Sequence, residues 1–529
     1  MRGIFLGAYQ MKHETADTFN YTLVVSGILT VLLITCHSSS AATKVLVKEK
    51  PMGQTPPNMT KKDIVVSPDR KHAAFVIKRD GKEIVVLDGV EGKAYTYIKQ
   101  RNHTPRGYIL SFSRNGEHLG YIAGHDGKEF TVIDGKEERT YDKVMSNIIR
   151  FGPEGRPVAY LVRIGNKEKV VADRIESKEY DDIIGPYLSY DGKHIAYKAY
   201  LGNKQLVVVD NQEGSLYDSV GLPSFSHDGK HLHYNASKDS KRRMVIDGIE
   251  GPEYDEIQRA VYSPDGQHIA YVARKGNKWT VVLDGVEQAE YDEKVVNLYF
   301  SLNGKRLAWL ARQDRKQFMV VDGRKEKEYD RISGYNFSNM GHPIFSPDSK
   351  HLAYSAKKGL MSCIVFDGNE KKKFLGVIWE PVFSPDSRRF AYGVVGQGRC
   401  YVIIDGIEHK RYYGVDDIRF SPDSKRVAYK AHKAQLAKSL IVVDGVESKT
   451  CDAIVSLGAH FSPDSKHVAY IIRRDKKFIV VVDNIESNEY DDILGHPQRA
   501  IIFDSPDSLH TLVRKGRDIL LLEFDIVED

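Results

Sequence analysis

Short hydrophobic and polar runs alternate from residue 63 to the end of the chain, and they recur in a fixed order. In one copy, an apolar stretch (260 to 263) ends in a Pro-Asp-Gly turn, and the alternating run HIAYVA (268 to 273) follows. A basic turn then leads to WTVVLDG (279 to 285), whose Asp-Gly pair is typical of a two-residue hairpin. A polar run such as EYDEI (253 to 257) completes the pattern. Because a period of two indicates strands, each copy predicts four short antiparallel strands.

The pattern occurs twelve times, at intervals of 37 to 46 residues. Its most constant position is a serine before the Pro-Asp turn, replaced once by glycine. We call this residue the anchor of each unit; the anchors are Ser67, Ser113, Gly152, Ser189, Ser226, Ser263, Ser301, Ser346, Ser384, Ser421, Ser462 and Ser505. In ten units the hairpin aspartate follows the anchor by 21 residues. A four-stranded repeat of this period predicts an all-β protein of about twelve four-stranded β-propeller blades.

The third residue after the anchor divides the units into two groups. It is glycine in units 2 to 7 and serine in units 8 to 12, and the change coincides with a longer interval between Ser301 and Ser346. Since single propellers usually close with 4 to 8 blades, we favour blades 1 to 7 (63 to 335) followed by blades 8 to 12 (336 to 529) over one large ring. The segment 43 to 62 is interpreted as a tether. Its first residues, 43 to 49, are a candidate for the outer strand that the last unit lacks.

Blades such as FSPDSKHLAY (345 to 354) resemble the WD-like propeller repeats of TolB-like periplasmic proteins and of the propellers in tricorn and prolyl oligopeptidase-type proteases. The resemblance covers about residues 63 to 529 and is specific for the fold, not for an activity. It implies an exported interaction platform, or a gating domain attached to an enzyme. A prolyl oligopeptidase-type enzyme also needs a hydrolase domain with a G-x-S-x-G nucleophile. Because the repeats continue to the end of the chain, we expect no such domain here.

The first 42 residues differ in character from the repeats. An apolar run of 15 residues (21 to 35) is short for a membrane-spanning helix and typical of a secretory signal. A cut after Ala41 or Ala42 would release the mature protein. In a lipoprotein signal, Cys36 would instead receive a lipid, and a short uncleaved anchor is the third alternative. In each case we expect an exported protein that is periplasmic, secreted or anchored at the envelope.

Charge and cysteine content narrow the classes of function. The chain has 77 Lys and Arg against 72 Asp and Glu, and the net charge of +5 indicates no nucleic-acid partner. Beyond the N-terminal segment, Cys363, Cys400 and Cys451 are an odd number of cysteines. They predict buried thiols and no complete disulfide framework.

Residues that often serve catalysis or metal binding recur with the repeat. Eight histidines, from His72 to His510, lie five residues after an anchor. One histidine per blade keeps them apart, whereas a zinc ion needs its ligands within about 2.3 Å. The acidic run EYDD (179 to 182 and 489 to 492) recurs in near form in other units, whereas a glycosidase needs one carboxylate pair at one place. We therefore expect structural roles for these residues, no cofactor, no metal and no enzymatic activity.

Positive charge gathers in the turns between the second and third strands of the units. All but one of these turns carry net positive charge, and in a propeller they emerge on the same side. We interpret this face as a candidate surface for an acidic protein, an anionic glycan or a lipid headgroup. Its candidate residues are Lys241, Arg242, Arg243, Arg274, Lys275, Lys278, Arg312, Arg315, Lys316, Arg473, Arg474, Lys476 and Lys477. The alternative interpretation is a solvated rim that nearby YDD carboxylates neutralise.

These features favour an exported, non-enzymatic β-propeller scaffold for protein or glycan partners at the cell envelope. A membrane would be contacted only through the N-terminal segment. The alternative is a propeller enzyme, a hydrolase or lyase, or a sugar-binding lectin with its site in a central funnel, built from residues that depart from the repeat. Candidate departures are NFSNMGH (336 to 342), which includes His342, and the enlarged turn KAHKAQLAK (430 to 438).

Overall fold

The computed structural model of the chain describes residues 20–26, 29–35, 43–100, 108–145, 149–332, 343–434, 438–496 and 499–528. These residues form β-strands joined by turns, with one turn of 3-10 helix, η1 (Lys61–Asp63). The strands make twelve sheets of at least four strands each, which confirms the predicted all-β propeller fold. Within the described ranges, no helix has the length and apolar character needed to span a membrane.

The chain falls into two compact units. One comprises residues 78–84 and 93–408 and holds blades 2 to 9. The other comprises residues 1–77, 85–92 and 409–529 and holds blades 10 to 12, and blade 1 is divided between the two.

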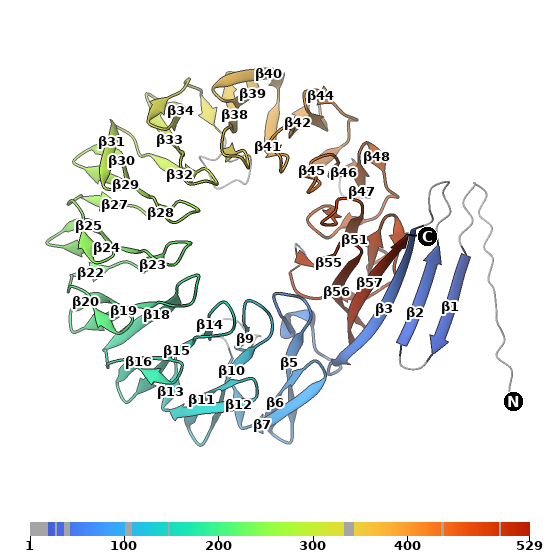
Figure 1. Ribbon diagram of the computed structural model, residues 1–529, viewed down its shortest axis with the longest axis horizontal. Coiled ribbons are helices and arrows are strands. Elements are labelled where there is room, and N and C mark those ends of the chain that lie inside the picture. The colour runs from blue at the N-terminus through green and yellow to red at the C-terminus, as the bar shows by residue number, and fades with distance from the viewer. Residues whose placement is uncertain are drawn as a thin grey trace. The chain divides into compact units, whose positions relative to one another are not determined.

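Each blade has the same strand positions (Figure 1). The first strands are β4 (Val65–Val66), β9 (Leu110–Phe112), β14 (Arg150–Phe151), β18 (Asp182–Leu188), β23 (Ser224–Phe225), β28 (Val261–Tyr262), β32 (Val296–Phe300), β37 (Ile344–Phe345), β41 (Val377–Phe383), β45 (Gly414–Phe420), β50 (His460–Phe461) and β55 (Ile502–Ser505). The second strands are β5 (Ala73–Arg79), β10 (Leu119–His125), β15 (Val158–Ile164), β19 (Ile195–Leu201), β24 (Leu232–Lys238), β29 (Ile269–Lys275), β33 (Leu307–Gln313), β38 (Leu352–Lys358), β42 (Phe390–Gly396), β46 (Val427–Ala434), β51 (Val468–Arg474) and β56 (Ser508–Lys515). The third strands are β6 (Lys82–Leu87), β11 (Lys128–Ile133), β16 (Lys167–Ala172), β20 (Lys204–Val209), β25 (Lys241–Ile246), β30 (Lys278–Leu283), β34 (Lys316–Val321), β39 (Met361–Phe366), β43 (Arg399–Ile404), β47 (Lys438–Val443), β52 (Lys477–Val482) and β57 (Asp518–Glu528). The fourth, outer strands are β7 (Val90–Tyr95), β12 (Lys136–Tyr141), β17 (Ile175–Glu176), β21 (Gln212–Glu213), β26 (Ile249–Glu250), β31 (Val286–Tyr291), β35 (Arg324–Lys325), β40 (Asn369–Leu375), β44 (Ile407–Glu408), β48 (Val446–Glu447), β53 (Ile485–Glu486) and, in blade 12, β3 (Thr43–Gln54). Short additional strands precede some first strands: β8 (Tyr97–Ile98), β13 (Lys143–Val144), β22 (Ser219–Val220), β27 (Glu256–Ile257), β36 (Arg331–Ile332), β49 (Ala453–Ile454) and β54 (Asp492–Ile493).

Blade 6 shows how the repeat builds a sheet. Ala270 of β29 lies between Val261 of β28 and Leu283 of β30, and the strands are antiparallel throughout. The turn from β30 to β31 has positive φ at both of its central residues, 49° at Asp284 and 80° at Gly285. This is the two-residue hairpin that the Asp-Gly pair predicts, because aspartate and glycine tolerate left-handed backbone angles.

The hairpin aspartate also explains the constant spacing of 21 residues from the anchor. Asp284 accepts the backbone N–H of Ile269 at 2.9 Å, and its other oxygen lies 2.7 Å from Nδ1 of His268. The hydroxyl of the anchor Ser263 accepts the N–H of His268 at 2.9 Å. The same histidine–aspartate contact occurs at His72, His118, His194, His231, His351 and His467. These histidines therefore have a structural role in the blades that carry them, as predicted.

The polar motif EYDEI was predicted to be the outer strand of a blade. The outer strands β7, β12 and β31 do extend to the tyrosine of this motif, but in blade 5 the prediction was wrong. The outer strand β26 follows the hairpin of blade 5 at once. The motif instead crosses between blades: Tyr254 bridges Arg242 at the edge of blade 5, whereas Glu256 pairs with Arg274 of blade 6. The difference arises because the tight hairpin at Asp247 and Gly248 brings Ile249 and Glu250 directly to the outer edge of the sheet, before the polar motif begins at residue 253.

The apolar core of the unit with blades 2 to 9 lies between successive blades. Met244 of blade 5 is buried against Tyr271 and Val282 of blade 6, together with Tyr254 of the crossing motif. The rings of Tyr254 and Tyr271 meet edge to face with centroids 6.4 Å apart. Burying one such side chain contributes about 1.5–3 kcal/mol, so the contact between blades is a large part of each blade's stability.

Blades 7 and 8 pack on each other in the same way. Met319 of blade 7 and Tyr354 of blade 8 share one apolar cluster. The hydroxyl of Tyr329 donates to Glu370 in blade 8, as Tyr254 donates to Glu287 between blades 5 and 6. Blades 7 and 8 are therefore packed together on both sides of residue 335, and the favoured break into seven and five blades is not found there.

The change from glycine to serine in the later units has a local cause. Ser349 of unit 8 has φ 65°, close to the 74° of Gly304 in unit 7. The serine hydroxyl accepts the backbone N–H of Asn303 in the preceding blade at 3.0 Å. The residue change therefore keeps the turn and adds a hydrogen bond between blades.

In the other unit, the N-terminal segment completes the last blade. β3 pairs with β57, with Val47 opposite Phe524, and the side chains of Val45 and Val47 are buried. The hydroxyl of Tyr490 donates to Glu49 at 2.7 Å, so Glu49 takes the place that a glutamate of the outer strand has in other blades. This confirms the prediction that residues 43 to 49 provide the missing outer strand.

Two further strands precede β3 in the chain. β1 (Asn20–Ser26) and β2 (Leu29–Thr35) form a hairpin, and β2 pairs with β3. Cys36 and the predicted cleavage region lie outside the described residues. Signal cleavage, lipidation and export stay predictions.

Blade 12 packs on the first strands of blade 1 within this unit. Arg70, three residues after its anchor, has φ 63° and is almost fully buried. Its guanidinium donates to the backbone oxygens of Leu494 at 2.5 Å and His496 at 2.6 Å. Phe75 and Leu494 share an apolar cluster. Within this unit, the last blade is therefore in direct contact with the first strands of blade 1.

We expect Val47→Asp to unfold the closing edge of blade 12. A carboxylate at this buried position costs about 3 kcal/mol or more, and β3 should detach from β57. Hydrogen–deuterium exchange should then become fast in residues 518–528 and stay slow in blades 4 to 6. The control Lys50→Asp changes an exposed position of the same strand. Unchanged protection of β57 in Val47→Asp would contradict the assignment.

Candidate functional site

The lysines of the basic turns are held by the aspartates that follow the tyrosines of the polar motif. Lys241, the first residue of β25, donates to Asp255 at 2.6 Å, and the other oxygen of Asp255 accepts the N–H of Gly276 in the next blade at 2.7 Å. The hydrogen bond from Lys241 is the main reason that the pKa of Asp255 lies below its usual value. The same pairing joins Lys128, Lys167, Lys204, Lys278, Lys316 and Lys477 to Asp142, Asp181, Asp218, Asp292, Asp330 and Asp491.

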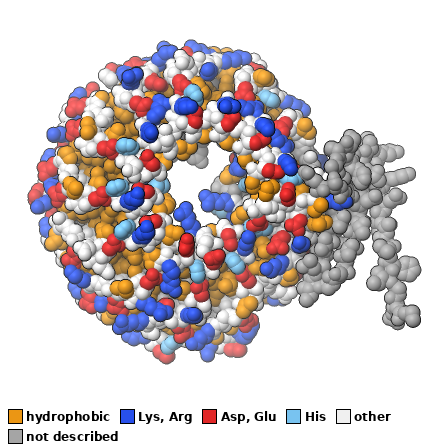
Figure 2. Space-filling view, viewed as in Figure 1, with side chains coloured by type: hydrophobic (Ala, Val, Ile, Leu, Met, Phe, Trp, Pro, Cys, Tyr) orange, Lys and Arg blue, Asp and Glu red, His pale blue; other side chains and the backbone are white. Residues whose placement is uncertain are grey.

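Most of the predicted basic surface is therefore neutralised. Eight of its thirteen residues contact a carboxylate: Lys241, Arg243, Arg274, Lys278, Arg312, Lys316, Arg474 and Lys477. Five are exposed and have no carboxylate partner in the described part of the chain: Arg242, Lys275, Arg315, Arg473 and Lys476. Figure 2 shows basic and acidic side chains intermixed over the face in view. The interpretation as a rim neutralised by carboxylates describes most of these turns.

A second feature is a set of departures at the position after the anchor. This position is proline in eight units and is Arg114, Tyr190, His227 or Leu302 in the others. The guanidinium carbon of Arg114 lies 5.7 Å from the ring centroid of Tyr190, which stacks on His227 with centroids 5.2 Å apart. Tyr190 is 50% exposed. Blades 2, 4 and 5 thus present a cation and two stacked rings to the solvent.

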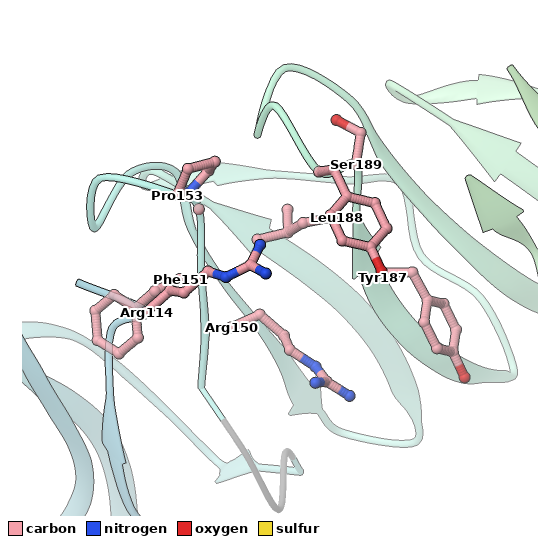
Figure 3. A pocket seen from close by; sticks show the side chains of 9 residues that line it. Arg114, Arg150, Phe151, Pro153, Tyr187, Leu188 and Ser189 are labelled. Atoms are coloured by element: carbon pink, nitrogen blue, oxygen red, sulfur yellow. The ribbon is translucent and has the colours of Figure 1, made fainter. Parts of the chain in front are cut away.

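A cavity of about 260 Å³ opens beside these residues. Its walls include Arg114, Arg150, Phe151, Tyr187 and Tyr190, from blades 2 to 4. Figure 3 shows the side chains of Arg150 and Tyr187 extending the same way from neighbouring blades. Arg114 and Arg150 have no carboxylate partner within the described residues. The cavity therefore offers positive charge next to aromatic faces.

A larger cavity of about 570 Å³ shares the wall residue Tyr187. It is lined by His233, Gln258 and Arg259, among other residues of blades 4 to 6. His233 stands seven residues after its anchor, where the other units among the first eleven have alanine or, once, glycine. Nδ1 of His233 and Nε2 of Gln258 are buried and have no hydrogen-bond partner among the described residues. Buried polar groups normally have partners, so these two are suited to a ligand.

The environment of His233 keeps its imidazole neutral. Burial, assisted by the charge of Arg259, lowers the pKa of His233 to about 4. The ring packs edge to face on Tyr262 with centroids 5.0 Å apart. At neutral pH the side chain offers one nitrogen as donor and the other as acceptor.

A chain of Ser439, His432 and Asp416 in the other unit has the composition of a hydrolase triad. The serine hydroxyl lies 3.0 Å from Nδ1 of His432, and Nε2 lies 3.0 Å from Asp416. Ser439 is only 4% exposed and pairs with His432 across two adjacent strands. A buried hydroxyl between strands has no path for substrate, so this chain is interpreted as a structural hydrogen-bond network.

The remaining predictions fall on other parts of the structure. Residues 336–342, with His342, lie outside the described residues, as do residues 435–437 of the enlarged turn. Cys363 and Cys451 are buried free thiols, and Cys400 is half-buried. Within the described ranges, no group of three or more His, Cys, Asp and Glu side chains is placed to hold a metal ion.

Sequence reasoning missed both cavities, although part of the signal was present. Arg114 and Tyr190 stand at a position that is usually proline, and His233 stands at a position that is usually alanine. Comparing the units position by position would have selected these residues. The approach of Arg150 to Tyr187 depends on how blades pack, so the repeat pattern does not predict it.

We expect His233→Ala to remove part of the protein's acid sensitivity. The folded-state pKa near 4 lies below the ordinary value near 6.5, so the unfolded state binds more protons between these values. The wild type should lose up to about 3 kcal/mol of stability from this group as the pH falls from 6.5 to 4. His233→Ala should not show this loss. Urea unfolding at several pH values measures the free energy of unfolding of both proteins. The contributions of all other titrating groups cancel in the difference between the two. If this difference does not change with pH, the lowered pKa of His233 is contradicted.

Comparison with known proteins assigns neither a family nor an activity to the chain. No protein-family model matches the chain, and no curated protein matches it. Similar solved structures include a eukaryotic initiation factor, with 13% identity over 62% of this chain and 93% of that chain at TM-score 0.34. TolB from Acinetobacter baumannii is 14% identical over 57% of this chain and 79% of that chain, at TM-score 0.23. The β-propeller domain of the Trilobed protease from Pyrococcus furiosus is 15% identical over 50% of this chain and 94% of that chain, at TM-score 0.24. The β-propeller assignment of this chain therefore rests on its own sheets.

Proposed function

We propose that the protein is an exported, non-enzymatic β-propeller scaffold that binds an acidic protein at the cell envelope. The observation that carries this proposal is the placement of Arg242, Lys275 and Arg315. They are exposed on the basic turns of three consecutive blades, 5 to 7, and have no carboxylate partner within the described residues. The apolar run at residues 21 to 35 is the reason for expecting export.

Neighbouring residues show how these three differ from the paired basic residues of the same turns. Lys241 and Lys278 are neutralised by aspartates of the same repeat, so they hold the frame together. Unpaired charges on a rigid frame attract an oppositely charged partner over roughly 8 Å at physiological salt. Binding through them should weaken as the salt concentration rises.

The proposal is tested with the triple variant Arg242→Glu, Lys275→Glu and Arg315→Glu. Paired residues such as Lys241 and Arg243 are left unchanged, because a new glutamate there would face Asp255 or Glu250 and destabilise the blades. The control variant makes the same charge change on exposed positions of outer strands, at Lys136, Arg324 and Lys371.

Crosslinking in the native envelope followed by mass spectrometry gives the readout. The wild type and the control variant should capture the same acidic protein, and capture should fall at high salt. The triple variant of Arg242, Lys275 and Arg315 should no longer capture this protein, and it should keep the unfolding midpoint of the wild type. If the triple variant captures as much of this protein as the wild type does, the proposal is refuted.

A further inference from the structure

Two cavities share Tyr187, and the turns that line the smaller one lie at the opposite end of the second strands from the basic turns. In blade 5, for example, His227 precedes β24 and Arg242 follows the turn after it. We call the pair of cavities the Tyr187 site. We infer that the Tyr187 site binds an oligosaccharide that carries carboxylate groups. This site is separate from the surface of the proposed function, so the failure of either proposal leaves the other standing.

Three guanidinium groups give the Tyr187 site its charge. Arg114 and Arg150 line the smaller cavity and Arg259 lines the larger one. All three are exposed and have no carboxylate partner in the described ranges, in a protein whose basic turns are mostly paired. A planar guanidinium binds a carboxylate through two parallel hydrogen bonds. Arginines at separate places in the site therefore fit a ligand with more than one carboxylate.

Aromatic side chains provide a stacking surface next to these charges. Tyr190 is half exposed while it stacks on His227, and Tyr187 forms a wall of both cavities. A sugar ring has an apolar face of C–H groups that packs on an aromatic ring. The remaining edge of a sugar ring carries hydroxyl groups, which need hydrogen-bonding partners.

The larger cavity supplies such partners. His233 is more than nine-tenths buried, and its Nδ1 has no partner within the described residues; the same holds for Nε2 of Gln258. A hydroxyl both donates and accepts, so it satisfies a neutral imidazole nitrogen and an amide nitrogen alike. The volume of about 570 Å³ is within the usual range for a small-ligand site. Polar walls of this kind favour a carbohydrate over a lipid chain or an apolar peptide.

The repeat itself provides variants that remove the site with little risk to folding. Arg114→Pro and Tyr190→Pro introduce the residue that the same turn position has at Pro264 and in seven other units. The matched control is Leu302→Pro, the same reversion in blade 7, where Leu302 lines neither cavity.

Isothermal titration calorimetry on the full chain tests the inference, with hexasaccharides of a uronic acid as probe. We expect binding by the wild type and Leu302→Pro, and at least tenfold weaker binding by Arg114→Pro and Tyr190→Pro. The carboxyl-reduced, neutral hexasaccharide should also bind at least tenfold more weakly. His233→Ala should weaken binding of both sugars, because it removes a contact to hydroxyl groups.

Four results would overturn the inference. These are no binding of the uronic acid hexasaccharide, equal binding of its reduced form, unchanged binding in the two proline variants, or equal binding of polyglutamate. The last would assign the site to an acidic peptide.

Discussion

In several polar motifs, the aspartate that follows the tyrosine links one blade to the next. Asp255 holds a lysine of its own blade and, with its other oxygen, the N–H of Gly276 in the following blade. A single repeat unit cannot bury its apolar faces alone, so such links and the apolar contacts between blades are required for the fold. This requirement explains why the basic turns carry so much charge, because their lysines form ion pairs with the aspartates that link the blades.

Because the repeat secures the frame, single units can depart from it. Tyr190 replaces the turn proline and His233 replaces a buried alanine, and their blades still have the common strand register. Residues that break a local pattern without an evident structural gain are where function is expected. In this protein such residues gather around Tyr187, whereas most of the histidines, aspartates and lysines serve the frame.

The sequence was sufficient for the first three strands of each blade. It was insufficient for the outer strand of blade 5 and for the contacts between blades. The spacing from Ser263 to Asp284 predicted a blade, and the unfinished last unit predicted the closing strand at residues 43 to 49. The pairing of Lys241 with Asp255 was not predicted because it depends on the path by which the chain crosses to the next blade. The change from Gly304 to Ser349 suggested two propellers, yet both residues adopt the same left-handed angle, so this difference carries no information about ring closure.

The unfolding midpoint of Asp255→Ala tests the central claim most directly. The account predicts a clearly lower midpoint than that of the wild type, because Lys241 and the N–H of Gly276 lose their common acceptor. The control Glu154→Ala changes an exposed acidic position in the same compact unit, which holds blades 2 to 9, and it should leave the unfolding midpoint unchanged. An Asp255→Ala variant as stable as the wild type would contradict the view that these carboxylates hold the blades together.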